Sequence, residues 1–281
     1  MTSQSFSFSR LTVYFQHELE YNAKKFLLYF GIIAGTLLLI GIFNYFQFDR
    51  AIEDSYSGEL DPTLHSIVQL YSIFLVAFGC MSASLMWNEM KTKQGRLSVL
   101  MTPASAIEKF IVKISIYIIL FIIVYIFAVI IAESIRYLIL YLIYPDSAVV
   151  PLYLSGRFNE TDNQYIWDIF GTSANHPIWI LVMVFLIIQS FFVLGASIWY
   201  SKSFIKTFLA LGILIITFYF FTGGCFELFI NHKRGDPPGP FYWLQNHAYI
   251  SFTVFAALVT IINWTLACCR FTETEIITIK K

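Results

Sequence analysis

Charged residues inside apolar stretches are the first candidates for chemistry, because an ion held away from water is costly and usually functional. Glu133 and Arg136 are one helical turn apart, so their side chains can pair. Glu227 lies near the end of a later apolar stretch, after Gly223 and Gly224. The sequence leaves two interpretations of these charges, a substrate path or an ion pair at the membrane interface. We favour the interfacial ion pair for Glu133 and Arg136.

No catalytic motif accompanies these charges. The sequence has no G-x-x-x-x-G-K-[ST] loop for ATP, no H-E-x-x-H zinc motif and no G-x-S-x-G nucleophile elbow. The five histidines are irregularly spaced, and the four cysteines lie in or beside apolar runs without the spacing of a zinc site or a disulfide framework. We therefore expect no catalytic residue, metal or cofactor on this chain. Any energy for transport would have to come from another protein.

The composition places the chain in a membrane. Of its 281 residues, 58% are hydrophobic and only 13% are charged, about half the charged share of a soluble domain. Such a chain cannot cover its own surface with charges, so lipid must cover much of it. The net charge of zero argues against nucleic acid as a partner.

Six apolar stretches are long enough to cross a hydrocarbon core of about 30 Å as helices. We therefore expect an all-α membrane protein with a transmembrane domain at residues 26–270 and a cytoplasmic tail at 271–281. Small residues in the second span would allow close helix contact. The expected spans are residues 26–47, 66–86, 111–132, 177–200, 207–230 and 248–269.

An amphipathic helix is expected at the N-terminal end of the chain, within residues 1–25. Leu11, Tyr14 and Leu19 follow helical spacing, and charged residues fall elsewhere around the helix. This pattern is typical of a helix lying at a membrane surface. It would precede the first span as a separate cytoplasmic element.

Three further segments would lie on or near the outer side. Residues 133–144 continue the apolar pattern of the third span, and we expect them to extend past the outer surface or to fold along it. Residues 145–176 form the largest polar segment and would make a small outer cap. Gly223 and Gly224 indicate a break in the fifth span, as a kink or a partly re-entrant turn.

The distribution of lysine and arginine predicts the orientation of the chain. With the N terminus inside, 13 of these residues fall on the inner side and 5 on the outer side, which accounts for all 18. Cationic residues favour the cytoplasmic side. We therefore expect both termini in the cytoplasm.

The central polar stretch, residues 87–110, separates the second and third spans and reads WNEMKTKQGRLSVLMTPASAIEKF. A basic loop between two spans should face the cytoplasm, where a soluble partner can bind it. Two helix starts are compatible with its end. Ser105 and Glu108 match a capping box, whereas Thr102 could cap a helix that has Pro103 at its first position.

This stretch and the six-span pattern resemble the permease subunits of ABC transporters of the ABC-2 type. The segment LSVLMTPASAIEKF is similar to the pattern L-x-x-L-L-x-P-A-S-x-x-E-K-F of a group of bacterial permeases, many from Bacteroidetes. Met101 departs from it, because leucine is more usual there. The residues that carry the match are Leu97, Leu100, Pro103, Ala104, Ser105, Glu108, Lys109 and Phe110.

The resemblance implies a transport subunit, without enzyme activity of its own, in a bacterial cytoplasmic membrane. Two permease subunits, as a homodimer or with a related chain, would each rest on a separate ATPase subunit that binds ATP and Mg²⁺. The cargo would be exported. The coupling segment between spans two and three would transmit ATPase closure, although its cations also fit simple anchoring at the cytoplasmic side. The residues implied in ATPase coupling are Glu89, Met90, Lys91, Lys93, Gly95 and Arg96, with Lys202 in a second, smaller contact.

Two other functions remain compatible with the sequence. The chain could be a membrane-anchored binding or assembly protein whose outer cap, residues 145–176, is the binding module. It could also be an intramembrane enzyme or a secondary carrier, which would need Glu133, Glu227 or the outer histidines. We favour the permease.

Overall fold

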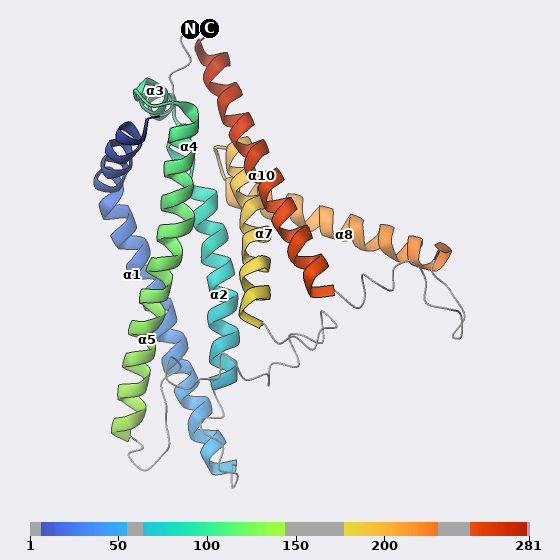
Figure 1. The fold of residues 1–281 in the computed structure, drawn as a ribbon. Helices are drawn as coiled ribbons and strands as arrows, with labels where there is room; N and C mark the ends of the chain where they lie inside the picture. The colour runs from blue at the N-terminus through green and yellow to red at the C-terminus, as the bar shows by residue number, and fades with distance from the viewer. Residues whose placement is uncertain (1–6, 55–63, 144–176, 230–247, 280–281) are drawn as a thin grey trace. The chain divides into compact units, whose positions relative to one another are not determined.

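The computed structural model of the chain describes residues 7–54, 64–143, 177–229 and 248–279 (Figure 1). All regular structure in these ranges is helical, and six of the helical segments are long and apolar enough to cross a membrane. The prediction of an all-α protein is therefore confirmed, and the described residues contain the six helical segments long and apolar enough for the predicted spans. The cytoplasmic location of the termini stays a prediction, and the expected outer cap at 145–176 lies outside the described residues.

The chain divides into two compact units. Unit 1 contains α1 (Phe8–Asp54), most of α2 (Leu64–Leu85), α4 (Ala106–Ile114), the π-helical segment η2 (Ser115–Leu120), α5 (Phe121–Ile143) and the first part of α7 (Pro177–Ile198). Unit 2 contains η1 (Asn88–Lys91), α3 (Lys93–Met101), the rest of α7, α8 (Ser203–Phe229) and α10 (Ala248–Ile279). We describe each unit by itself.

Helix α1 joins two elements that the sequence predicts as separate. It runs for 47 residues without a break at residue 25, where the sequence indicates the end of the amphipathic helix. At about 1.5 Å per residue it is about 70 Å long. Its first 36 residues, Phe8–Phe43, contain a stretch long and apolar enough to cross a membrane. The polar residues Glu18 and Asn22 are buried, so one polar face of this segment packs on protein.

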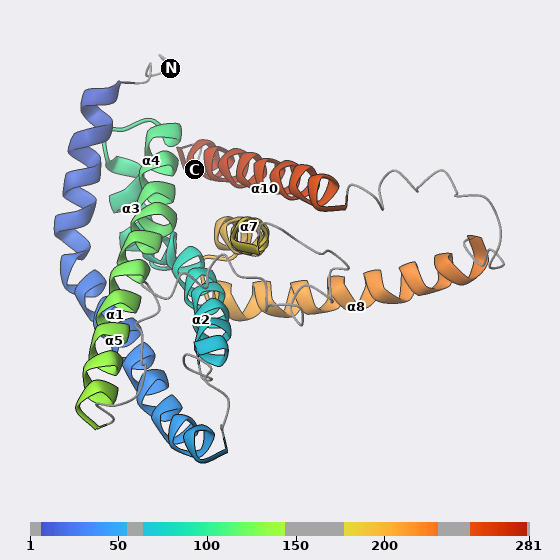
Figure 2. The ribbon, with the colours of Figure 1, turned by 60° about the horizontal axis from the view of Figure 1, so that its bottom comes forward.

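Helices α1 and α5 form the main contact of unit 1 and lie side by side in Figure 1 and Figure 2. Leu37 of α1 and Ala128 and Ala132 of α5 are almost completely buried. Gly41 faces Arg136 at this crossing, where an added Cβ atom would make an ordinary van der Waals contact of 3.6 Å with Arg136 Cβ. Small residues at such crossings are typical of helices packed in membranes.

The third span is one long helical segment, Ala106–Ile143, that includes six residues of π-helix. The predicted extension beyond residue 132 is present as a direct continuation of α5. Within the π-helical segment the carbonyl of Tyr117 accepts a hydrogen bond of 2.7 Å from the Ser82 hydroxyl of α2. Such segments alter the backbone hydrogen-bond pattern of a helix, and here a side chain of a neighbouring helix binds one of its carbonyls.

The second span packs through small residues, as the sequence predicts. A Cβ atom on Gly79 would lie 2.4 Å from Cε2 of Phe185, which belongs to the part of α7 in unit 1. Ala83 is completely buried. The glycine therefore permits the contact between α2 and α7.

Helix α8 contradicts the predicted break in the fifth span. It is continuous from Ser203 to Phe229, through both Gly223 and Gly224. Glycine disfavours a helix by only about 1 kcal/mol, less than the cost of leaving backbone groups without hydrogen bonds in lipid. Glu227 lies on this helix, and its side chain lies outside the described residues.

We expect Gly79→Leu to destabilise the protein by about 1–3 kcal/mol, because the added side chain overlaps Phe185. Gly212→Leu is the matched control, since no heavy atom lies within 4 Å of a Cβ there. Detergent unfolding titrations of both variants measure the difference. Equal stability of the two variants would contradict the contact between α2 and α7.

Candidate functional site

The coupling segment, residues 83–102, belongs to unit 2, although the chain on either side of it belongs to unit 1. The chain leaves unit 1 after Ser82 and returns to it at Pro103. The segment therefore packs within unit 2 and is joined to unit 1 by the chain at both of its ends.

An aromatic stack attaches the coupling segment to α10. The rings of Trp87 and Phe271 are 4.1 Å apart between centroids and inclined by 18°. Both side chains are almost completely buried, at 1% and 0% exposure. Met90, from η1, is also buried. The stack fixes the start of the segment to a helix that follows it by more than 150 residues in the chain.

Arg96 forms a second attachment within unit 2. Its Nε donates a hydrogen bond of 2.7 Å to the carbonyl of Met90, and its guanidinium lies 5.7 Å from the ring centroid of Tyr200. A cation over an aromatic face is an attractive arrangement. Arg96 therefore holds α3 against η1 and against the turn after α7, although part of its surface is still exposed.

The turn between η1 and α3 depends on a glycine. Thr92 caps α3, and its Oγ1 accepts a hydrogen bond of 3.1 Å from Gly95 N–H. A Cβ atom at Gly95 would lie only 2.0 Å from the carbonyl oxygen of Glu89. Any larger residue at position 95 must displace either α3 or η1. The sequence prediction names Gly95 for coupling, and its role in the structure is to allow this close approach.

An exposed face of α3 carries a cation and two apolar side chains. Lys93, Leu97 and Met101 are spaced by four residues and so share one face of the helix. Leu97 is 52% exposed and Met101 is 78% exposed. We call these three residues the α3 face. Their spacing was a signal in the sequence that the prediction of the coupling residues did not use.

The predicted coupling residues separate into exposed and internal ones. The structure exposes Lys91, Lys93 and Lys202, and Lys202 has a positive φ of 55° in the turn before α8. Met90 is 2% exposed, so it lies inside unit 2, and its predicted part in coupling stays a prediction. A cationic and partly apolar surface remains for a partner.

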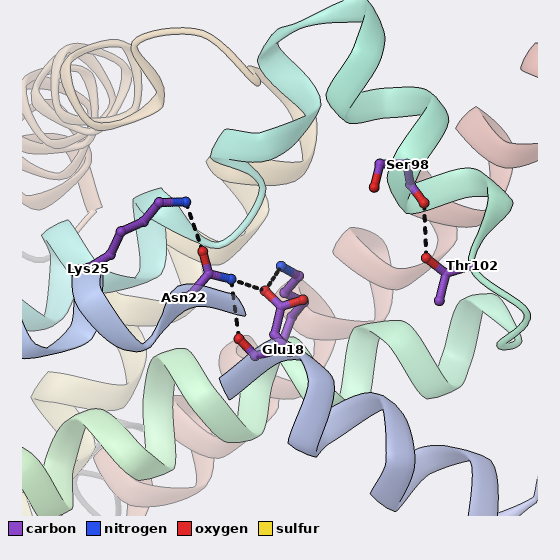
Figure 3. Close-up of polar contacts among 6 residues, drawn as sticks. Glu18, Asn22, Lys25, Ser98 and Thr102 are labelled. Atoms are coloured by element: carbon purple, nitrogen blue, oxygen red, sulfur yellow. Dashed lines mark hydrogen bonds and ion pairs between the residues drawn. The ribbon is translucent and has the colours of Figure 1, made fainter. Parts of the chain in front are cut away.

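The junction between α3 and α4 follows one of the two predicted helix starts. Ser105 caps α4, and the capping box with Glu108 is complete, with bonds of 3.3 Å and 2.8 Å. Thr102 instead ends α3, and its hydroxyl donates to the carbonyl of Ser98 at 2.9 Å (Figure 3). The alternative in which Thr102 caps α4 is wrong.

The carboxylate of Glu108 also binds the first turn of α1. It accepts a hydrogen bond of 2.7 Å from Ser7 N–H and one of 3.2 Å from Arg10 Nη2. Its side chain is completely buried. One carboxylate therefore caps α4 and the N-terminal end of α1 together. Negative charge is favourable at both positions because the N-terminal end of a helix carries a partial positive charge.

The residues of the family-like motif are mostly internal. Glu108 and Lys109 are at most 2% exposed, and Ala104 is 8% exposed. Pro103 is exposed, and Leu100 is half-buried. Most of the motif therefore stabilises the junction between the coupling segment and α4, and only Leu97, at 52% exposure, and Pro103 are exposed.

A second polar cluster joins α4 to α1 one to two helical turns further along. The ammonium group of Lys113 binds the carboxylate of Glu18, and both side chains are buried. Asn22 Nδ2 donates to Glu18 Oε1 at 2.8 Å, and Asn22 Oδ1 accepts from Lys25 at 2.8 Å (Figure 3). No local pattern in the sequence predicts this cluster, because Glu18 and Lys113 are 95 residues apart in the chain.

Glu133 and Arg136 pair as predicted, and both side chains are buried in unit 1. Their predicted location at the membrane interface stays a prediction. Arg136 Nη2 lies 3.0 Å from Glu133 Oε2, with 3% and 0% of the side chains exposed. The Tyr71 hydroxyl of α2 donates to Glu133 Oε1 at 2.8 Å. The Tyr125 hydroxyl donates to the Tyr71 carbonyl at 2.6 Å. The carboxylate is thus compensated by a guanidinium and a phenol, which disfavours its use as a catalytic acid or base.

The described residues contain no group of three or more His, Cys, Asp or Glu side chains that could hold a metal ion. Comparison of the chain with protein-family models, curated proteins and solved structures finds no match.

Glu108→Ala should destabilise the protein by about 3 kcal/mol, because it leaves Arg10 and two helix-terminal N–H groups without the carboxylate. Glu20→Ala, at an exposed position of α1, should change the stability by less than about 0.5 kcal/mol. Detergent unfolding titrations give both values. A stable Glu108→Ala variant would show that the carboxylate does not hold α1 to α4.

The stack of Trp87 on Phe271 is tested by a double-mutant cycle. Each alanine substitution should cost about 3–5 kcal/mol, as for other buried aromatic residues. The double variant should cost about 1 kcal/mol less than the two single effects added together. Phe255→Ala, at an exposed position of α10, is the control. Additive effects would mean that the two rings do not stabilise one another.

Proposed function

We propose that the chain is the membrane-spanning subunit of an ATP-driven transporter of the ABC-2 type. The observation that supports this most is the coupling segment, which packs on unit 2 while its two ends continue into unit 1. A separate ATPase subunit that pushes on this segment would displace the two units relative to one another. Such a displacement is what alternating exposure of a transport path requires.

The ATPase would bind the exposed surface of the coupling segment. The α3 face supplies apolar side chains beside Lys93, and Lys91 adds a second exposed cation. This surface fits an apolar recess rimmed by carboxylates. Lys202, exposed in the turn before α8, would add the smaller contact that the resemblance implies.

The coupling segment would move as a unit when an ATPase pushes on this surface, because side-chain contacts hold it to the helices around it. Trp87 is stacked on Phe271, and Arg96 is bonded to the carbonyl of Met90. On the other side, the capping box of Ser105 and Glu108 connects the segment to α4 and then to α1. In this proposal the internal residues transmit the displacement, and the exposed residues receive it.

ATP and Mg²⁺ would be bound by the ATPase, since the chain lacks a phosphate-binding loop. A second permease subunit would complete the transport path in the membrane, and the membrane would be the bacterial cytoplasmic membrane. Export is the direction that the resemblance favours. The apolar spans, in a chain with 29 Phe and 17 Tyr, would suit an amphipathic or hydrophobic cargo. The chain itself would catalyse no reaction.

We expect Lys93→Glu to reduce the ATPase that co-purifies with the protein about tenfold, which corresponds to about 1.4 kcal/mol of binding. Leu97→Asp should have a similar effect, because it places a charge in the apolar part of the α3 face. Lys24→Glu, at an exposed position of α1, should have no effect. The measurement is ATP hydrolysis after a mild-detergent pull-down, with the ATPase identified by mass spectrometry.

The result can also reject the proposal. If the folded protein, shown to elute as a single species in size-exclusion chromatography, brings down no ATPase, the chain is not such a permease. If an ATPase binds equally well to Lys93→Glu, Leu97→Asp and Lys24→Glu, the coupling segment is not its binding surface.

A further inference from the structure

The two units differ in whether their buried polar groups have partners. In unit 1 the buried carboxylates Glu18, Glu108 and Glu133 all bind cationic side chains. Apart from Arg10, whose guanidinium binds Glu108, the buried side-chain polar atoms that find no hydrogen-bond partner among the described residues all belong to unit 2. They are in Trp87, Gln189, Ser203, Thr207, Ser251 and Trp264.

Burying Gln189 has the highest desolvation cost among these residues, because both of its polar atoms are without a partner among the described residues. It is 1% exposed, and neither its amide nitrogen nor its amide oxygen has a partner among the described residues. It lies at the centre of the candidate span Leu181–Ile198. An amide can donate two hydrogen bonds and accept two, and a lipid environment offers none in return. A glutamine at this depth therefore needs a hydrogen-bonding group that the described chain does not provide.

Other uncharged polar residues lie at the same level of unit 2. Asn263 of α10 donates a hydrogen bond of 2.9 Å from Nδ2 to the hydroxyl of Ser190, the neighbour of Gln189 on α7. Asn263 is 6% exposed, and it lies near the middle of the candidate span Ile250–Thr274. Thr260, one turn before it, is also buried. The contact between α7 and α10 is thus polar at mid-span.

The chemistry of these residues selects a neutral ligand. The buried polar side chains of unit 2 among the described residues are serine, threonine, glutamine and asparagine, without a charged one. An ion placed beside them would lose its hydration without meeting an opposite charge. A hydroxyl, an amide or a water molecule can both donate to and accept from an amide side chain.

We propose that Gln189, together with Ser190 and Asn263, forms a binding site inside unit 2 for a neutral hydrogen-bonding group that enters from outside the protein. The group is either water or a hydroxyl or amide of a larger guest. The site does not depend on an ATPase partner, so it stands or falls separately from the proposed transport function.

Accessibility of position 189 tests the site. In the full-length protein with Cys80, Cys225, Cys268 and Cys269 replaced by alanine, a single cysteine is introduced as Gln189→Cys or, as the control, as Phe192→Cys. Phe192 lies on the same helix, is 3% exposed and is larger, so its replacement opens at least as much space. Both variants are reconstituted in liposomes, and their reaction with 2-hydroxyethyl methanethiosulfonate, a neutral polar thiol reagent, is followed by mass spectrometry.

We expect the cysteine at position 189 to react at least tenfold faster than the one at position 192. Equal rates in two folded variants would overturn the proposal, because a neutral polar molecule would then have no preferred access to Gln189. Size-exclusion chromatography of both variants verifies that they are folded.

Gln189→Leu distinguishes the two sources of the ligand once position 189 has proved accessible. If water occupies the site permanently, leucine removes its partner and lowers the thermal unfolding temperature of the purified protein. If the site takes a group of a visiting guest, leucine removes an unpaired amide from the empty protein and raises that temperature. Both results support a site for a neutral group and differ only in what fills it.

Discussion

The structure depends first on the buried carboxylate of Glu108. It accepts hydrogen bonds from the N-terminal ends of two helices, α1 and α4, and from the guanidinium of Arg10. Helix α4 follows the coupling segment directly in the chain, so the carboxylate holds α1 to the point where the chain returns to unit 1. The ion pair of Lys113 with Glu18 repeats the connection further along the same two helices. A single helix 47 residues long is thereby held at its N-terminal end as well as at its crossing with α5.

The buried polar groups of the two units differ in charge and in how many of them have hydrogen-bond partners. In unit 1 the charges are compensated, so they connect helices and leave little free chemistry, as the pairing of Glu133 with Arg136 and Tyr71 shows. In unit 2 the buried polar groups are neutral and partly without partners among the described residues. A paired interior favours rigidity, and an unpaired one favours an exchangeable ligand. The coupling segment is connected to both kinds of interior, since it packs in unit 2 and the chain continues from both of its ends into unit 1.

Local signals in the sequence predicted much of the fold but few of its long-range contacts. The apolar lengths predicted six spans, and Ser105 with Glu108 predicted the start of α4, because these features depend on neighbouring residues. The amphipathic pattern of residues 1–25 suggested an element separate from the first span, yet α1 continues through residue 25, since exposed cations such as Lys24 and Lys25 do not interrupt a helix. The stack of Trp87 on Phe271 has no local signal. Gln189 stands in the middle of the fourth apolar run in the sequence. An uncharged amide there carries no known motif, so the charged residues and histidines were the only candidate polar sites predicted.

The position of Phe271 has a consequence for biosynthesis. Trp87 emerges from the ribosome 184 residues before its stacking partner, the difference between positions 271 and 87. At about 5–20 residues per second, synthesis of the intervening chain takes on the order of 10–40 s. During that time the indole ring of Trp87 has no α10 to cover it, and the coupling segment is exposed to chaperones and proteases. Helix α10 therefore completes the packing of the segment, so a chain that stops before residue 271 leaves Trp87 without its stacking partner.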